Sequence, residues 1–141
     1  MATVEIDDHS DEYMKDVDKA LEKALTAIGI HLEGEAKEEL ENTPRRIDTG
    51  LLRNSITYAL DGEAAAQTSY SADDGSKSGS YSGTAPKDEQ RSVMVGTNVE
   101  YALYVHEGTQ KTEANRFLKN ALDRNREQCS DYVKKALENG S

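Results

Sequence analysis

Apolar residues recur at every third or fourth position over the first part of the chain. From about Asp11 to Glu41 they form one stripe, made of Val17, Leu21, Ala24, Ile28, Leu32, Ala36 and Leu40. This spacing predicts a long amphipathic helix. Ser10 is the candidate N-cap, and Pro44 sets the far boundary because the residue before a proline is pushed out of helical space. Gly29 and Gly34 are each expected to weaken the helix by about 1 kcal/mol relative to Ala.

A change of period marks the middle of the chain. Between Leu51 and Leu60 the apolar and polar positions alternate, notably at Ile56, Tyr58 and Leu60, which predicts a half-buried strand. A short apolar run from Val93 to Val95 predicts a second strand. Residues 61–92 contain no Leu, Ile, Val, Phe or Met, so we expect a flexible hairpin loop. An antiparallel hairpin with this loop at its tip is the simplest connection.

Two more helices are predicted near the C-terminus. Asn98 is a candidate N-cap for a short helix over Val99–Glu107, with Gly108 placed to end it. Thr112 is the candidate cap of a last helix that runs to about Glu138. The 141 residues fit one domain. The predicted class is α+β: a long N-terminal helix after an acidic tail over 1–10, a small antiparallel sheet with a long hairpin loop, and a short helix and a C-terminal helix packed on the sheet.

Composition narrows the possible partners. The formal net charge is −10, from 27 acids against 17 bases, and such a surface repels phosphates, so we expect no specific nucleic-acid binding. With one Phe and no Trp the core of one copy is modest, and burial against other copies would help it. No apolar run approaches the roughly 20 residues that span a bilayer, and the acidic N-terminus does not look like a signal peptide. We therefore expect synthesis in the cytoplasm and no membrane contact.

No pattern in the sequence predicts a catalytic, metal or cofactor site. None of the three histidines belongs to a metal-binding spacing. His106 and Glu107 are adjacent on a predicted helix and are expected to point about 100° apart. Cys129 has no second cysteine to pair with and is expected to be a buried, inert thiol. An enzyme is not expected.

Four residues outside the apolar pattern are candidate interface residues. Arg45 and Arg46 lie close to Arg53, and these arginines either pair with nearby helix carboxylates or dock onto an acidic face of a neighbouring subunit. Tyr70 and Tyr81 are the only large side chains of the 61–92 segment. They are either incidental or anchors for the loop on a partner.

Two segments, DTGLLRNSI and VGTNVEYALYVHEGT, occur in this order along the chain. With the Ala114–Leu122 region they resemble the tail-component family of long-tailed phages, typified by the tenth gene product of a lambda-like coliphage. The chain departs from the family pattern at Ala114–Phe117, where an alanine–arginine–proline–phenylalanine run is common, and at His106. The motif positions are Asp48, Thr49, Gly50, Leu52, Arg53, Ser55, Gly96, Thr97, Asn98, Tyr101, Ala102, Tyr104, Val105, Glu107, Gly108, Thr109 and Phe117.

These motif positions are expected to be mainly structural. Gly50, Gly96 and Gly108 stand at element boundaries, where left-handed or tight backbone is most often needed. Tyr101, Tyr104 and Phe117 are the aromatic residues among the motif positions, so we expect them in the small core between the helices and the sheet.

The resemblance implies a role in assembly. Copies of such a protein form a homo-oligomeric ring in the neck or at the upper end of the tail of a phage or prophage virion. The implied partners are further copies of itself, the connector or stopper, the tail terminator and the tail tube. Genomic DNA would pass through the ring, and an acidic surface would let it pass without sticking. The alternative is a helical adaptor or assembly chaperone for another phage structural protein, which leaves the two motif segments unexplained.

Overall fold

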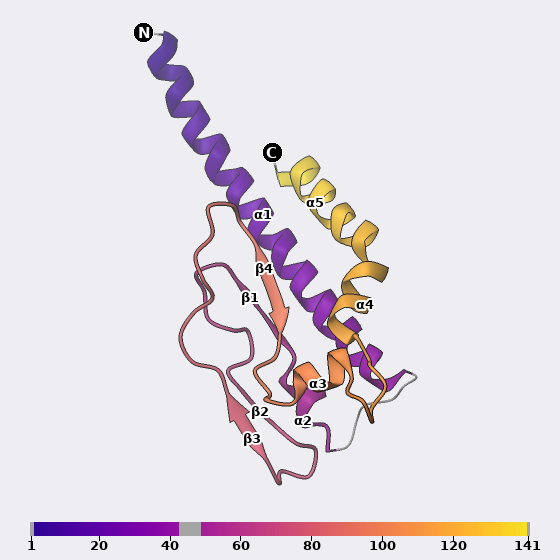
Figure 1. Ribbon diagram of the computed structural model, residues 1–141. Coiled ribbons are helices and arrows are strands. Elements are labelled where there is room, and N and C mark those ends of the chain that lie inside the picture. Colours follow the sequence, from indigo (N-terminus) through magenta and orange to yellow (C-terminus); the bar gives the residue numbers. More distant parts are fainter. Residues whose placement is uncertain (1, 43–48, 141) are drawn as a thin grey trace.

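The computed structural model describes the backbone of residues 2–42 and 49–140, with side chains described over 15–42 and 49–138. The predicted α+β class is confirmed. The helices, shown in Figure 1, are α1 (Ala2–Glu41), α2 (Leu51–Ser55), α3 (Ala102–Glu107), α4 (Phe117–Arg124) and α5 (Arg126–Gly140). The strands are β1 (Thr57–Leu60), β2 (Ser69–Ser71), β3 (Ser78–Ser80) and β4 (Val93–Gly96).

Helix α1 is the central element. The β1–β4 sheet packs on one side of it, and α4 and α5 pack on another (Figure 1). Five residues of the predicted apolar stripe are buried, while Val17 and Leu21 are only half-buried. The buried face repeats at every fourth position and also includes Ala20: Ala20, Ala24, Ile28, Leu32, Ala36 and Leu40. The helix begins at Ala2 rather than near Asp11, so the expected acidic tail belongs to the helix and Ser10 does not cap it. Acids in a first turn complement the helix dipole, which is compatible with the longer helix.

The predicted antiparallel pairing of the two apolar strands is confirmed. Tyr58 lies opposite Val95, and Leu60 lies opposite Val93. The first half of the expected strand is instead the short helix α2. Gly50 precedes it with a left-handed backbone, and the Asn54 N–H donates to the Gly50 carbonyl over 2.8 Å. Helical hydrogen bonds thus replace strand pairing over α2, and the backbone becomes extended at Ile56, directly after the helix.

The segment 61–92 is more ordered than its composition predicts. It contains a second antiparallel sheet, β2–β3, and the Ala66 N–H donates to the Tyr58 carbonyl of β1 over 2.8 Å. At its base, the Asp61 carboxylate is 3% exposed, accepts the Ser92 N–H over 3.1 Å and lies 3.3 Å from Arg91 Nε. The segment is a hairpin connection as predicted, but it contains a sheet of its own, because hydrogen bonds and ion pairs supply contacts that apolar burial does not.

The C-terminal helices begin later than expected. Helix α3 starts at Ala102, so Asn98 is not its cap, and α4 starts at Phe117. Thr112 instead forms a turn with Thr109, whose N–H donates to the Thr112 carbonyl over 2.8 Å. The expected single last helix is divided at Asn125. Helix α5 lies along α1, and α4 borders β4 across a groove.

Candidate functional site

The two motif segments meet in space through a pair of hydroxyls. Ser55 Oγ lies 2.5 Å from Thr97 Oγ1 and donates to the Leu52 carbonyl over 2.6 Å. A hydroxyl carries one proton, so Thr97 donates to Ser55. Thr97 Oγ1 in turn accepts the Val99 N–H over 3.1 Å. Ser55 is fully buried, and the pair fixes the end of α2 against the end of β4.

The β2–β3 hairpin is held to α2 by Asp73. Arg53 Nη2 donates to both Asp73 oxygens over 2.9 Å, and Asn54 Nδ2 donates to Asp73 Oδ1 over 2.9 Å. The Asn54 hydrogen bond and the Arg53 charge hold the pKa of Asp73 below its usual value. Arg53 also lies 3.3 Å from Glu41 of α1, so the predicted pairing with a helix carboxylate is confirmed at this position. Arg45 and Arg46, for which the same pairing was predicted, and the motif residue Asp48 lie outside the described residues.

The other side of the hairpin is held by Asn98 and the two tyrosines. The Tyr70 hydroxyl donates to Asn98 Oδ1 over 2.5 Å, and Asn98 Nδ2 donates to the Ser80 carbonyl over 2.9 Å. The Tyr81 hydroxyl donates to the Ser55 carbonyl over 2.6 Å. Burial raises the pKa of Tyr70. The Tyr70 and Tyr81 hydroxyls therefore anchor the hairpin within this chain, and the contact of these residues with a partner stays a prediction.

The glycine predictions hold at two of three positions. Gly50 and Gly108 have φ values of 83° and 80°, in the left-handed region that favours glycine. A Cβ at Gly50 would lie 2.5 Å from Asp73 Oδ2, so this glycine also makes room for the hairpin. The Asp73 N–H donates to the Thr49 carbonyl beside it over 2.8 Å. Gly96 does not have a positive φ, and its prediction is wrong.

The aromatic predictions hold only for Phe117, which is 0% exposed in the core. Tyr101 and Tyr104 are 42% and 63% exposed. Because α3 starts after Tyr101, its inner face is formed by Ala102 and Val105, which pack against the core. The two tyrosines consequently belong to the surface.

His106 and Glu107 do meet, although they are neighbours in the chain. His106 Nε2 lies 3.3 Å from the Lys119 N–H and accepts it, so Nδ1 carries the proton and donates to Glu107 Oε1 over 2.8 Å. This bond and the Arg116 charge lower the pKa of Glu107. The ring also packs edge-on against Phe117. The contacts with Lys119, Phe117 and Arg116 fix α3 against the start of α4, which is a structural role.

Other chemistry is sparse in the part of the chain that the structure describes. It contains no group of three or more side chains placed to hold a metal ion. Burial raises the pKa of the half-buried Cys129 thiol, which makes the thiolate less available. None of the described helices has both the length and the apolar character to span a membrane.

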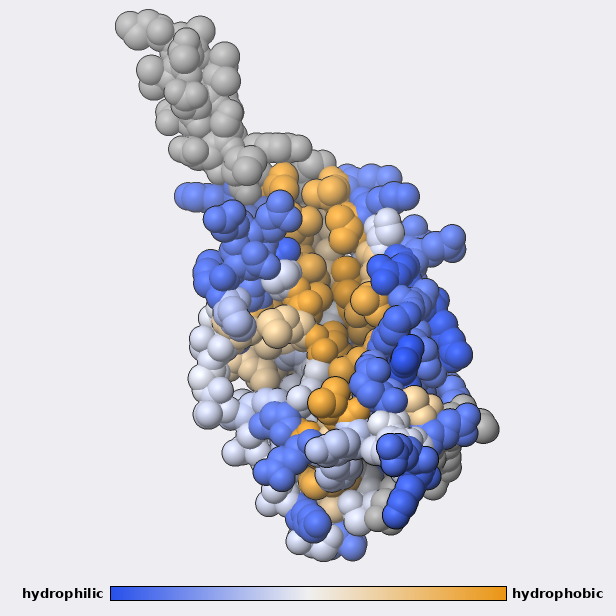
Figure 2. All heavy atoms as spheres, viewed as in Figure 1, coloured by the Kyte–Doolittle hydropathy of each residue, from blue (hydrophilic) through white to orange (hydrophobic). Residues whose placement is uncertain are grey.

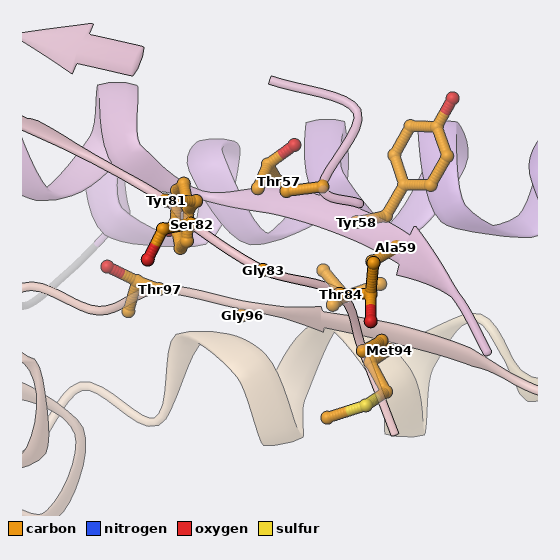
Figure 3. A pocket seen from close by; sticks show the side chains of 13 residues that line it. Thr57, Tyr58, Ala59, Tyr81, Ser82, Gly83, Thr84, Met94, Gly96 and Thr97 are labelled. Carbon is orange, nitrogen blue, oxygen red and sulfur yellow. The ribbon is translucent and has the colours of Figure 1, made fainter. Parts of the chain in front are cut away.

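A hollow of about 280 Å³ lies on the face of the β1–β4 sheet that points away from α1. Figure 3 shows residues 81–84 running between Thr57 and Ala59 of β1 on one side and Met94 of β4 on the other. Its lining includes hydroxyls and methyl groups but no acid, base or histidine. The ionisable side chains of the lining are the phenols of Tyr58 and Tyr81, and the Tyr81 hydroxyl donates to the Ser55 carbonyl.

An apolar band is the most prominent feature of the surface. Figure 2 shows it running along the molecule between hydrophilic flanks. It includes a groove of about 350 Å³ with a floor of Leu32 and Ala36, one wall at Val93 and Val95, and the other at Leu118 and Leu122. Leu122 is 41% exposed there. Bands of this kind mark sites of protein contact.

Exposed side chains of α3 extend the apolar surface of the molecule. Leu103 is 67% exposed and Tyr104 is 63% exposed. Sequence periodicity could not find these residues, because it identifies which residues are apolar but not which of them lack a partner within the chain.

The fold and its apolar band define a small α+β subunit with a surface suited to protein contacts. The chain belongs to the HK97-gp10-like family, described as "Bacteriophage HK97-gp10, putative tail-component", whose model matches residues 5–108. The resemblance inferred from the motif segments is thereby confirmed, while its extension to Ala114–Leu122 lies beyond the matched residues. No curated protein and no solved structure shows a significant match to the chain.

Proposed function

We propose that this protein is a structural subunit of the virion that joins the head connector to the tail, as a homo-oligomeric ring in the neck or at the upper end of the tail. Membership of a tail-component family supports a structural role in the virion rather than a catalytic one, and it implies contacts with other tail proteins. The apolar band carries the finer proposal, because a solvent-exposed groove walled by aliphatic side chains is stabilised when a partner covers it.

Copies that contact each other through two different faces form a closed ring when the rotation between them closes. The partners above and below such a ring are the connector or stopper on the head side and the terminator or tube on the tail side. The net charge of −10 would let DNA pass through the ring without binding it. The same acidic surface also favours solubility before assembly.

The first test is whether the protein is present in the mature virion. We expect mass spectrometry of purified particles to find it, and inactivation of its gene to leave filled heads and separate tails. Absence from mature particles, with assembly still lost, would instead indicate an assembly chaperone and refute the proposal.

A second test uses a matched pair of surface variants. Leu122→Glu places a charge in the groove, while Ile30→Glu places one at a 56% exposed isoleucine of α1. Ile30 is two residues from Leu32 of the floor and so points to another side of the helix. We expect only Leu122→Glu to abolish head–tail joining, with both proteins folded. Equal behaviour of the two variants would argue against the band as the contact surface.

A further inference from the structure

The outer edge of β4 is an unpaired strand edge. In an antiparallel pair, alternate residues direct their backbone groups toward the partner strand. The Asp61 N–H donates to the Ser92 carbonyl over 3.0 Å, so Met94, two residues further along the β1–β4 register, also faces β1. Val93 and Val95 therefore direct their N–H and C=O groups away from β1. Within the described residues, neither valine has another backbone partner.

This open edge borders the apolar groove described above. Val93 and Val95 form one wall of the groove, α1 forms its floor, and α4 stands across it. An unpaired edge beside apolar surface is suited to an added strand, whose backbone pairs with the edge while alternate side chains enter the groove. The two features together favour an extended segment over a helix as the occupant.

We propose that the groove receives residues 2–7 of a second copy of this chain, added as a third strand against β4. In this segment Ala2, Val4 and Ile6 alternate with Thr3, Glu5 and Asp7, which is the period of a half-buried strand. Val4 and Ile6 have the same two-residue spacing as the valines of the edge. Thr3, Val4 and Ile6 are β-branched, a type that favours strands over helices.

The charges at the groove are complementary to this segment. Lys119 is the one ionisable residue in the groove lining, and its side chain is 59% exposed. Its ammonium group donates to Asp123 and has two further donors. Glu5 and Asp7 alternate with the residues that enter the groove, so they would supply the acceptors at its solvent-facing rim, where the Lys119 side chain is exposed.

The chain's own segment is poorly placed to fill its own groove. Residues 2–7 open α1 at the end that reaches past the other elements (Figure 1). At 1.5 Å per residue, Ala2 stands about 45 Å along the helix from Leu32 on the floor. The first four N–H groups of any helix lack helical acceptors, so leaving the helix breaks only the hydrogen bonds that the carbonyls of residues 2–7 accept. Ladder hydrogen bonds with β4 would offset part of that loss. A neighbouring copy's groove is then the accessible site.

This inference rests on the proposed function and deepens it. Each copy would give one strand and receive one, through different parts of its surface. Such contacts are heterologous, and they close into a ring when the rotation between the copies closes. The strand would thus be the link between adjacent subunits.

The test compares paired variants of the full chain by size-exclusion chromatography with light scattering, with circular dichroism to confirm folding. Val95→Pro removes an N–H that points away from β1, which an edge strand tolerates, while Val95→Ala retains it. We expect wild type and Val95→Ala to form oligomers. Val95→Pro should require at least a tenfold higher concentration for half-assembly. If Val95→Pro assembled at the same concentration as the wild type, the proposal of a strand added to β4 would be refuted.

The second pair tests the donor segment and does not depend on the fold of β4. Val4→Asp with Ile6→Asp should abolish assembly, while Thr3→Asp with Glu5→Asp should retain it, because only one face of a strand enters the groove. Equal effects of the two double variants would overturn residues 2–7 as the occupant. A wild-type chain that stays monomeric at all concentrations would refute the claim that a second copy occupies the groove. If the protein were nevertheless found in virions, the proposed function would still stand.

Discussion

Two glycines in the middle of α1 are expected to respond in opposite directions to one substitution. A Gly→Ala change inside a helix gains about 0.8–1 kcal/mol from helix propensity. At Gly34 an added Cβ meets no atom within 4 Å. Gly34→Ala should therefore stabilise the protein by about that amount.

At Gly29 the same methyl group meets an aromatic ring. A Cβ there would lie 2.6 Å from Cδ2 and 2.7 Å from Cγ of Tyr58. The Tyr58 Cβ is also only 3.0 Å away, so rotating the ring does not relieve the clash and β1 itself must shift. Overpacking of this kind costs about 1–3 kcal/mol. Since the propensity gain is common to both sites, this cost is the expected difference between the two variants.

Thermal and urea unfolding measure that difference. For a chain near this size, 1 kcal/mol shifts Tm by about 2–4 °C, so Gly34→Ala should melt roughly 2–12 °C above Gly29→Ala. In a Tyr58→Ala background the ring is gone, and Gly29→Ala should become stabilising, a coupling that a double-mutant cycle isolates. Equal stabilisation by both substitutions in the wild-type background would show that Tyr58 does not pack on Gly29.

Three further predictions concern the hairpin and the core. Because the pKa of the Asp73 carboxyl is lowered in the fold, the ionised carboxylate stabilises the hairpin above about pH 4, and this stabilisation is lost as the pH falls through the lower pKa of the folded state. Limited proteolysis of residues 72–78 should increase at that acidic pH. Asp73→Asn should remove this pH dependence of the cleavage. Gly50→Ala, at φ 83° beside that carboxylate, should cost at least about 1–2 kcal/mol in urea unfolding, and no loss would contradict the left-handed backbone. Phe117→Ala should cost about 3–5 kcal/mol, and a cost under about 1 kcal/mol would mean that the ring is not in the core.

The helix α1 and the β1–β4 pair could be predicted because their information is local. An apolar residue at every fourth position from Ala20 to Leu40 specifies one buried face whatever else the chain does. The alternation of Ile56, Tyr58 and Leu60 does the same for a strand. The predicted helix boundaries were less accurate. Ser10, Asn98 and Thr112 each have the side chain of an N-cap, but none of them stands directly before the first residue of its helix.

The order of the 61–92 segment could not be predicted, because its contacts join residues far apart in sequence. Asp61 pairs with Arg91 at its base, and Asp73 pairs with Arg53 and Asn54 across to α2. Composition records only that the segment lacks apolar residues, and it carries no information on which polar groups will meet. The motif residues Arg53 and Asn98 therefore gain a physical role that their spacing alone did not reveal, since together with Asn54 they hold the hairpin from two sides.

The acidic surface and the apolar band impose opposite demands on assembly. Copies with a net charge of −10 repel each other, most strongly at low salt, so association has to come from a surface that carries little of that charge. The groove meets this condition, because Lys119 is the only ionisable residue in its lining and its sign is opposite to that of the chain as a whole. A contact here removes aliphatic side chains from water without bringing further acids together. In the proposed ring, the remaining surface would stay acidic toward solvent and toward passing DNA, so the contacts between copies and the repulsion of DNA would use different parts of the surface.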